Sequence, residues 1–244
     1  MRKVVRVSDT PEPDRLSGPA TPPNAAEIAR YLPLSQRPRR DESGVTAHWG
    51  PQVAQALGQL ADLLSGLSEA DWTTPSAREG FRVADVAGLV VWRTATPRLA
   101  RVWQRAVRAA RYRLFPSAIE LSLATEHAAH GRSAVADELR SHAETASTRS
   151  RSISDLAAVV LACYEISSVV GTPVTIDPVA SGAVGLARSL SAPVEIRAVL
   201  ATRSLVSTDG DWRVGKGSEI SGTSAEIILF LYRRGPLPGS AVMR

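Results

Sequence analysis

The chain has 244 residues, 44% of them hydrophobic and 22% charged, as expected for a globular protein with a core of ordinary size. Its formal net charge of +5 comes almost wholly from arginine, because Lys3 and Lys216 are the only lysines. A single cysteine, Cys163, excludes an internal disulfide and agrees with a reducing compartment. No run approaches the roughly 18 consecutive apolar residues of a membrane span, and the N-terminus lacks the apolar core of a signal peptide. We therefore expect a cytoplasmic protein without membrane contact.

Residues 1–44 differ in composition from the rest of the chain. They are rich in proline, serine, aspartate and arginine and show little apolar periodicity. Such a segment cannot bury enough apolar surface to fold, so we predict a disordered arm. Its basic clusters raise the question of nucleic-acid binding, but a solvated tail is the simpler interpretation.

Residues 45–172 show the 3.6-residue periodicity of amphipathic helices. The first helix is expected to follow Pro51, the second to begin near Val83, the third to follow Pro97, and the last to end at Gly171. A shorter amphipathic segment at 132–146 precedes the last. Short connections between such helices predict an antiparallel four-helix bundle.

The third helix has two contrasting sides. Leu99, Val102 and Trp103 belong to an apolar side, and arginines at positions 98, 101, 105, 108 and 111 form the other. We interpret the arginine side as the solvated outer face of the bundle. The alternative is an arginine-rich interaction protein that binds nucleic acid or an acidic partner. We do not favour nucleic acid, because no aromatic row or base-reading motif accompanies the arginines.

Residues 173–244 follow a different pattern. A helix is expected around 179–190, strands near 205–207, 212–214 and 219–221, and a closing helix from Ser224. The fold class is therefore mainly α with a small α/β part, divided into the arm at 1–44, a helical domain at 45–172 and a small C-terminal domain at 173–244.

Two stretches and the tail carry a family resemblance. Residues 74–89, TPSAREGFRVADVAGL, resemble the T-P-x-x-x-x-G-[WF]-x-V-x-D-V-x-x-H signature of mycothiol-dependent maleylpyruvate isomerases, a branch of the DinB-like four-helix proteins. Residues 158–171, AVVLACYEISSVVG, resemble that family's E-x-x-x-H-x-[WY]-[DE]-[IL]-x-x-x-x-G helix, and residues 205–234 are similar to its second domain. The resemblance implies a DinB-like four-helix bundle followed by a sterol-carrier-like α/β domain.

The resemblance also implies where a metal site would lie. In the family, the histidine of the first motif and the glutamate and histidine of the second bind a divalent metal such as zinc, which activates the thiolate of mycothiol. The aligned positions here are Leu89, Ala158 and Ala162, and three apolar side chains cannot hold a cation. We expect a divergent homologue that holds no metal and no cofactor of its own, and that keeps an interdomain pocket for a small-molecule thiol or organic acid. Nothing in the sequence requires more than a monomer.

An arginine of the second domain receives the substrate carboxylate in the family that the chain resembles. Arg233 and Arg234, at the end of the closing helix, are the candidates for that role. Cations at a helix C-terminus are also favoured by the helix dipole, which explains both residues without any ligand.

The alternative is that the protein is an active thiol-dependent isomerase or transferase, and two features of the sequence leave this possibility open. His127 and His130 are three residues apart and can share a displaced metal, but the pattern lacks a third ligand. Cys163 adjoins the position of the missing histidine and can act as a thiol nucleophile if its pKa is lowered. A cysteine in an apolar helix is more often a small buried hydrophobe.

Overall fold

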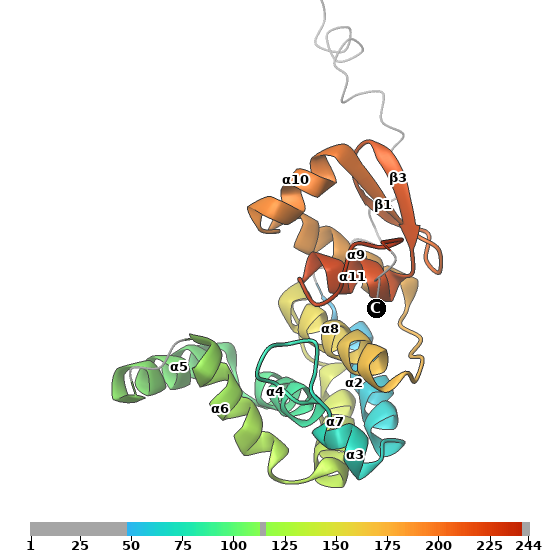
Figure 1. Cartoon of the computed structure of the whole chain (residues 1–244). Helices are drawn as coiled ribbons and strands as arrows, with labels where there is room; N and C mark the ends of the chain where they lie inside the picture. The colour runs from blue at the N-terminus through green and yellow to red at the C-terminus, as the bar shows by residue number, and fades with distance from the viewer. Residues whose placement is uncertain (1–47, 113–115, 241–244) are drawn as a thin grey trace, which may run out of the picture. The chain divides into compact units, whose positions relative to one another are not determined.

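The computed structural model describes residues 48–112 and 116–240 (Figure 1). All of these described residues belong to one compact unit. The arm predicted at 1–44 lies outside the described residues. The described chain is mainly helical and contains a small three-stranded sheet, which confirms the predicted fold class at this level.

The first part of the described chain consists of helices. They are α2 (Gly50–Ser65), α3 (Glu69–Thr73), α4 (Val83–Ala95), α5 (Arg98–Tyr112), α6 (Pro116–Ala128), α7 (Arg132–Ala146) and α8 (Ile153–Val170). The helices predicted near Pro51 and Val83, after Pro97 and before Gly171 are all present. Helix α6 was not predicted.

Helices α2, α4, α7 and α8 share one apolar core. Helix α2 packs against α7 and α8, and α4 packs against α6, α7 and α8. Fully buried side chains include Leu57 and Leu60 of α2, Leu139 of α7 and Leu156 of α8. The apolar face of each helix therefore meets the apolar faces of its neighbours.

Helix α8 lies at the centre of the molecule, between α2, α4 and α7 on one side and α9 and α11 on the other (Figure 1). A capping box of Ser152 and Asp155 begins it, and Gly171 ends it in the left-handed conformation. Among the described helices, only α8 is long and apolar enough to cross a membrane, by length and composition alone. The sequence had suggested no such stretch. The contacts of α8 with other helices on two sides explain its apolar composition as that of a core helix.

Two residues of the first motif hold α4 against α6. Asp85 accepts hydrogen bonds from the backbone N–H of Arg82 at the start of α4 and from Thr125 Oγ1 of α6, both at 2.9 Å. Gly88 lets the two backbones approach closely, because a Cβ added there would lie 2.2 Å from the Ala124 carbonyl oxygen. Part of the motif is therefore explained by helix packing.

The C-terminal part contains the sheet and the remaining helices. They are α9 (Pro178–Leu190), α10 (Val194–Thr202), β1 (Arg203–Ser207), β2 (Arg213–Gly215), β3 (Ser218–Gly222) and α11 (Ser224–Leu231). The strand order is β2-β1-β3, with β1 antiparallel to β2 and parallel to β3. Leu205, at the centre of β1, pairs with Val214 and Ile220. The three strands and the closing helix confirm the predicted elements, whereas α10 was not predicted.

Trp212 and Asp209 fix α11 and the sheet to α9. The Trp212 ring packs where α9 has Gly182 and Gly185, and a Cβ at Gly185 would approach the ring to 2.9 Å. Asp209 accepts hydrogen bonds from both the backbone N–H and the Oγ of Ser224 at 2.7 Å, at the start of α11. These residues therefore have a structural role.

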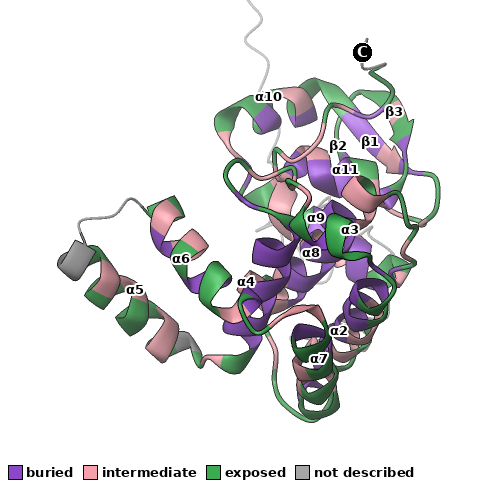
Figure 2. Cartoon of the chain, turned by 60° about the horizontal axis from the view of Figure 1, so that its bottom comes forward, coloured by how far each residue is buried: buried purple, intermediate pink, exposed green. Residues whose placement is uncertain are grey.

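The orientation of α5 is opposite to the prediction. Its arginines turn toward the rest of the protein, and Leu99, Val102 and Trp103 are exposed; Figure 2 shows α5 without buried residues. The reason is that α6 and α8 offer carboxylates on the inner side. Arg101 pairs with Asp155 of α8, and two further arginines pair with α6. The described arginines are therefore engaged in ion pairs and do not form a solvated outer face.

Candidate functional site

A pocket of about 200 Å³ lies between α4, α6, α8 and the end of α11. Its lining combines apolar side chains, which we call the floor, with two carboxylates and three guanidinium groups, which we call the rim. The lining residues are Arg78, Val86, Leu89, Val90, Arg93, Glu120, Ala158, Leu161, Ala162, Glu165, Tyr232 and Arg234.

The three positions aligned with metal ligands all line this pocket. Leu89 comes from α4, and Ala158 and Ala162 are one turn apart on α8. The structure thus brings together residues that are 69 and more positions apart in sequence, at one apolar surface. These leucine and alanine side chains can pack against a hydrocarbon group, but they have no atom that can coordinate a metal.

Glu165 and Arg234 form the most deeply buried charged pair at the pocket. Arg234 Nε lies 3.8 Å from Glu165 Oε2, and the Glu165 side chain is 3% exposed. Burial raises the pKa of the Glu165 carboxyl, and the charge of Arg234 opposes that shift only in part. Burial likewise lowers the pKa of Arg234. Glu165 Oε1 and Arg234 Nε both lack a hydrogen-bond partner among the described residues.

Glu120 organises the arginines on the opposite side. Arg78 donates a hydrogen bond to it at 2.6 Å, Arg93 lies 3.6 Å away, and Arg105 of α5 also donates to it. Burial alone would raise the pKa of Glu120, but the hydrogen bond from Arg78 and the nearby guanidinium charges outweigh burial and lower it. Glu120 is therefore ionised at neutral pH and holds Arg78 and Arg93 at the rim.

The two arginines proposed from the sequence have different positions. Arg233 is exposed and has a φ of 60°, in the left-handed region, directly after α11. Arg234 follows this turn and lines the pocket. Of the pair, Arg234 is the one placed to meet a ligand.

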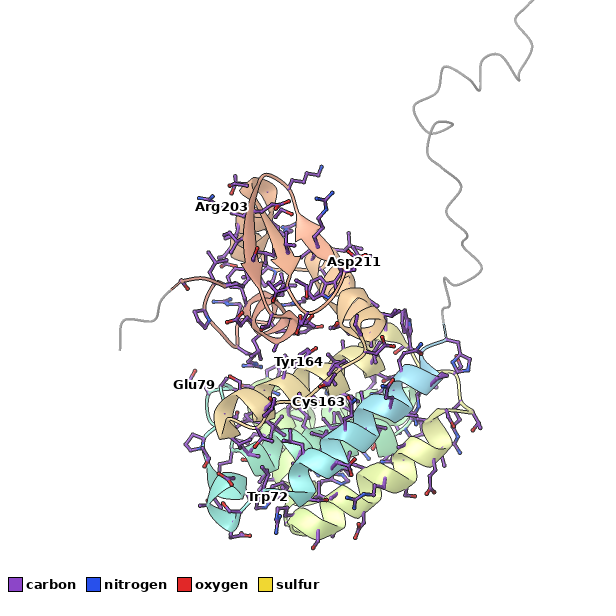
Figure 3. All side chains as sticks on the ribbon, turned by 90° about the vertical axis from the view of Figure 1, so that its right-hand side faces the viewer. Trp72, Glu79, Cys163, Tyr164, Arg203 and Asp211 are labelled. Carbon is purple, nitrogen blue, oxygen red and sulfur yellow. The ribbon has the colours of Figure 1, made fainter. Side chains whose placement is uncertain are left out.

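Cys163 does not reach the pocket. It is fully buried, and its thiol lies 3.5 Å from the Ala56 carbonyl oxygen of α2. Burial raises the pKa of the thiol to about 12, so the reactive thiolate is scarce at neutral pH. Figure 3 shows Cys163 on the side of α8 toward α2, and Tyr164 toward the C-terminal part. These properties are those of a buried core cysteine.

His127 and His130 lie next to each other near the end of α6. Their ring centroids are 6.2 Å apart, in an edge-to-face arrangement. Within residues 48–112 and 116–240, no cluster of three or more histidine, cysteine, aspartate or glutamate side chains is placed to hold a metal ion. The pair therefore finds no third protein ligand in the described chain.

Four charged residues of the pocket were not predicted as site residues: Arg78, Arg93, Glu120 and Glu165. One signal was present, because Arg93 and Glu165 each interrupt an otherwise apolar stretch of helix. A charge in such a stretch is seldom buried without a partner or a function. Arg78 and Glu120 carried no comparable signal, since they are 42 positions apart and meet only in the fold.

Comparison of the chain with protein-family models, curated proteins and solved structures gives no match.

Because Glu165 titrates, the free energy of unfolding should depend on pH. The variant Glu165→Gln should lack this contribution. A buried carboxyl whose pKa is raised in the folded state loses its proton first in the unfolded chain, so folding stability falls as pH rises above the ordinary value of 4.5. Below that value the group is neutral in both states and has no such effect. We expect the stability of Glu165→Gln relative to the natural protein to increase from about pH 4.5 to pH 8 in urea unfolding.

Glu219→Gln is the matched control for this experiment, because Glu219 is exposed on β3. The attraction of Arg234 for the ionised carboxylate is already contained in the Glu165 pKa, since arginine stays charged over this range. Any difference between neutral glutamic acid and glutamine shifts the Glu165→Gln curve by a constant. The change of this stability difference with pH therefore tests whether the pKa of Glu165 is raised. Curves for Glu165→Gln and the natural protein that run parallel would show that Glu165 has an ordinary pKa.

Proposed function

We propose that this pocket binds a small organic acid without a metal. In this proposal the chain is a divergent relative of the mycothiol-dependent maleylpyruvate isomerases, with a DinB-like bundle and a sterol-carrier-like C-terminal domain. The ligand's carboxylate contacts Arg234, and its hydrocarbon part lies on Leu89, Ala158 and Ala162. The apolar floor stands where the family would hold its cation.

The observation that carries the proposal is the pair of unpartnered atoms at the pocket, Arg234 Nε and Glu165 Oε1. A buried polar group without a hydrogen bond costs about 1–3 kcal/mol, and more if it is charged. A ligand with an anionic group for the arginine and a second polar group for the glutamate removes both costs. A hydroxy acid has this combination, because its hydroxyl can donate to the glutamate oxygen.

The size and charge of the pocket support the same class of ligand. A pocket of about 200 Å³ is smaller than the roughly 300–1,000 Å³ typical of drug-sized ligands. Three arginines face two glutamates, so the rim has an excess of positive charge. A short-chain acid of about five carbons matches both features.

A second hollow extends the site along α8. It has a volume of about 270 Å³ and shares Arg93, Ala158, Leu161 and Tyr232 with the first. Its far wall carries Arg188, whose guanidinium lies 4.7 Å from the centre of the Tyr232 ring. A longer acid therefore has room to extend past Ala158 and Leu161.

Calorimetric titration with pentanoate, 2-hydroxypentanoate and the neutral analogue pentanamide tests the proposal. We expect the two acids to bind and pentanamide to bind more weakly. We expect Arg234→Gln to weaken acid binding by about ten- to a hundredfold, because it removes a hydrogen bond between two charged groups. The hydroxy acid should bind more tightly than pentanoate, because its hydroxyl can donate a hydrogen bond to Glu165 Oε1.

Arg213→Gln serves as the matched control, since Arg213 lies exposed on β2 and lines neither hollow. It should leave binding unchanged. Equal binding of the acids and pentanamide, or equal losses in Arg213→Gln and Arg234→Gln, would contradict an anion site at Arg234.

A further inference from the structure

Helix α5 presents a continuous apolar face to solvent. Leu99 is 86% exposed, Trp103 71%, Val102 62% and Val107 43%, and the alanines at positions 106 and 109 are exposed beside them. Soluble monomers seldom leave a contiguous apolar surface of this kind uncovered. The face is therefore expected to have a partner.

The opposite face of α5 is fixed to the protein, so the helix cannot turn its apolar side inward. Arg105 and Arg108 pair with Glu120 and Glu126 of α6. Gln104 accepts a hydrogen bond from Trp92 Nε1 at 2.7 Å, and Arg101 binds Asp155 at 3.2 Å. Rotating the helix would break all of these contacts at once.

We propose that a second copy of this chain covers the face, with the two α5 helices packed antiparallel about a twofold axis. Leu99 and Trp103 are large and lie in the first half of the helix, whereas Ala106 and Ala109 are small and lie in the second. Antiparallel packing sets Trp103 of each copy against Ala106 of the other, and Leu99 against the turn that contains Ala109. Parallel packing would set tryptophan on tryptophan and alanine on alanine.

A hollow beside this face gives the opposing tryptophan room. It has a volume of about 350 Å³ and is lined by Ala106 and Ala109 of α5 and by Pro116 and Ile119 of α6, with Arg105 and Glu120 at its edge. The size pattern is thus self-complementary, as a twofold interface requires.

The exposed area fits a second copy. Covering the face in both copies removes on the order of 1,000 Å² from water, close to the lower limit for a specific interface. The three arginines of α5 whose side chains are described, at 101, 105 and 108, are each paired with a carboxylate, so they are not free to bind lipid phosphates. A dimer that dissociates at micromolar concentration is expected, in contrast to the monomer suggested by the sequence.

Sedimentation of the full chain between about 1 and 200 µM tests this inference, since a weak dimer changes population over that range. We expect the natural protein to dimerise and Trp103→Glu to stay monomeric. Leu190→Glu is the matched control: Leu190 is 79% exposed on α9, and this variant should still dimerise. Circular dichroism confirms that each variant folds.

A size exchange tests the antiparallel arrangement. Trp103→Ala and Ala106→Trp should each weaken the dimer at least tenfold, and the double variant should regain most of the affinity, because a large residue again faces a small one. Equal weakening in the double variant would overturn the arrangement.

Three results would overturn the second copy as the occupant. One is a natural protein that stays monomeric at all concentrations. Another is binding to vesicles that contain anionic lipid, lost in Trp103→Glu and without any dimer, which would assign the face to a membrane. The last is a monomer that dimerises only when residues 1–44 are deleted, which would assign the face to that segment.

Discussion

The triple variant Leu89→His, Ala158→Glu and Ala162→His is expected to bind zinc and to melt at a markedly higher temperature when zinc is present. Ala158 and Ala162 are one turn apart on α8, and Leu89 lies across the same pocket on α4. Three nitrogen and oxygen ligands at such positions suffice for a site that leaves one coordination position open. Zinc at about a thousand times its Kd would then stabilise the variant by about 4 kcal/mol.

The metal-free variant should be less stable than the natural protein, because it sets a carboxylate and two imidazoles on an apolar surface that is partly or fully buried. The matched control is the double variant Ala158→Glu and Ala162→His, which has one ligand fewer and should respond weakly to zinc. Thermal unfolding with and without zinc measures both. A triple variant that folds but shows no shift would mean that these side chains do not converge on one point.

Gly88→Ala is expected to destabilise the protein by about 3 kcal/mol, the upper end of the usual range for overpacking. The new Cβ would lie 2.2 Å from the Ala124 carbonyl oxygen and 2.9 Å from the Ala128 backbone nitrogen, so α4 and α6 must separate. Because Glu120 lies on α6, the separation also displaces the carboxylate that holds Arg78 and Arg93. Ligand binding should weaken together with stability.

Gly58→Ala is the same chemical change, but we expect it to increase the stability of the protein. Gly58 lies within α2, and nothing within 4 Å meets a Cβ there, so alanine should stabilise the helix by about 0.5–1 kcal/mol. Urea unfolding of both variants measures the difference. A Gly88→Ala variant as stable as the natural protein would contradict the close approach of α4 and α6.

Local signals in the sequence predicted the helices that the core requires. Pro51 near the start of α2 and Gly171 at the end of α8 act within their own helix, and apolar periodicity defines the faces between them. Helix α6 was missed because its apolar residues, such as Ile119 and Leu123, follow no strong period. Its position comes from the contact with α4, which no local pattern encodes.

The orientation of α5 shows what periodicity cannot provide. The pattern separates an apolar side from an arginine side, but it does not say which side faces the protein. That choice depends on Asp155 and Glu120, which lie 54 and 15 positions from their arginines. Ion pairs between distant residues therefore reversed an expectation drawn from hydrophobicity alone.

The candidate site was predictable in part. Leu89, Ala158 and Ala162 were identified by alignment with the family that the chain resembles, and Arg233 and Arg234 together as candidates to receive a carboxylate. The pairing of Arg234 with Glu165 spans 69 positions and becomes visible only in the fold. The sequence thus pointed to three apolar positions of the pocket, whereas the charged residues around them become visible only in the fold.

The most direct test of the metal-free acid site is an NMR measurement of contacts between 2-hydroxypentanoate and the protein in the presence of EDTA. With methyl-labelled alanine and leucine, we expect nuclear Overhauser effects from the terminal methyl group of the ligand to Leu89, Ala158 and Ala162, and their loss in Arg234→Gln. Contacts confined to Leu99 of α5, or no binding until zinc is added, would contradict the account.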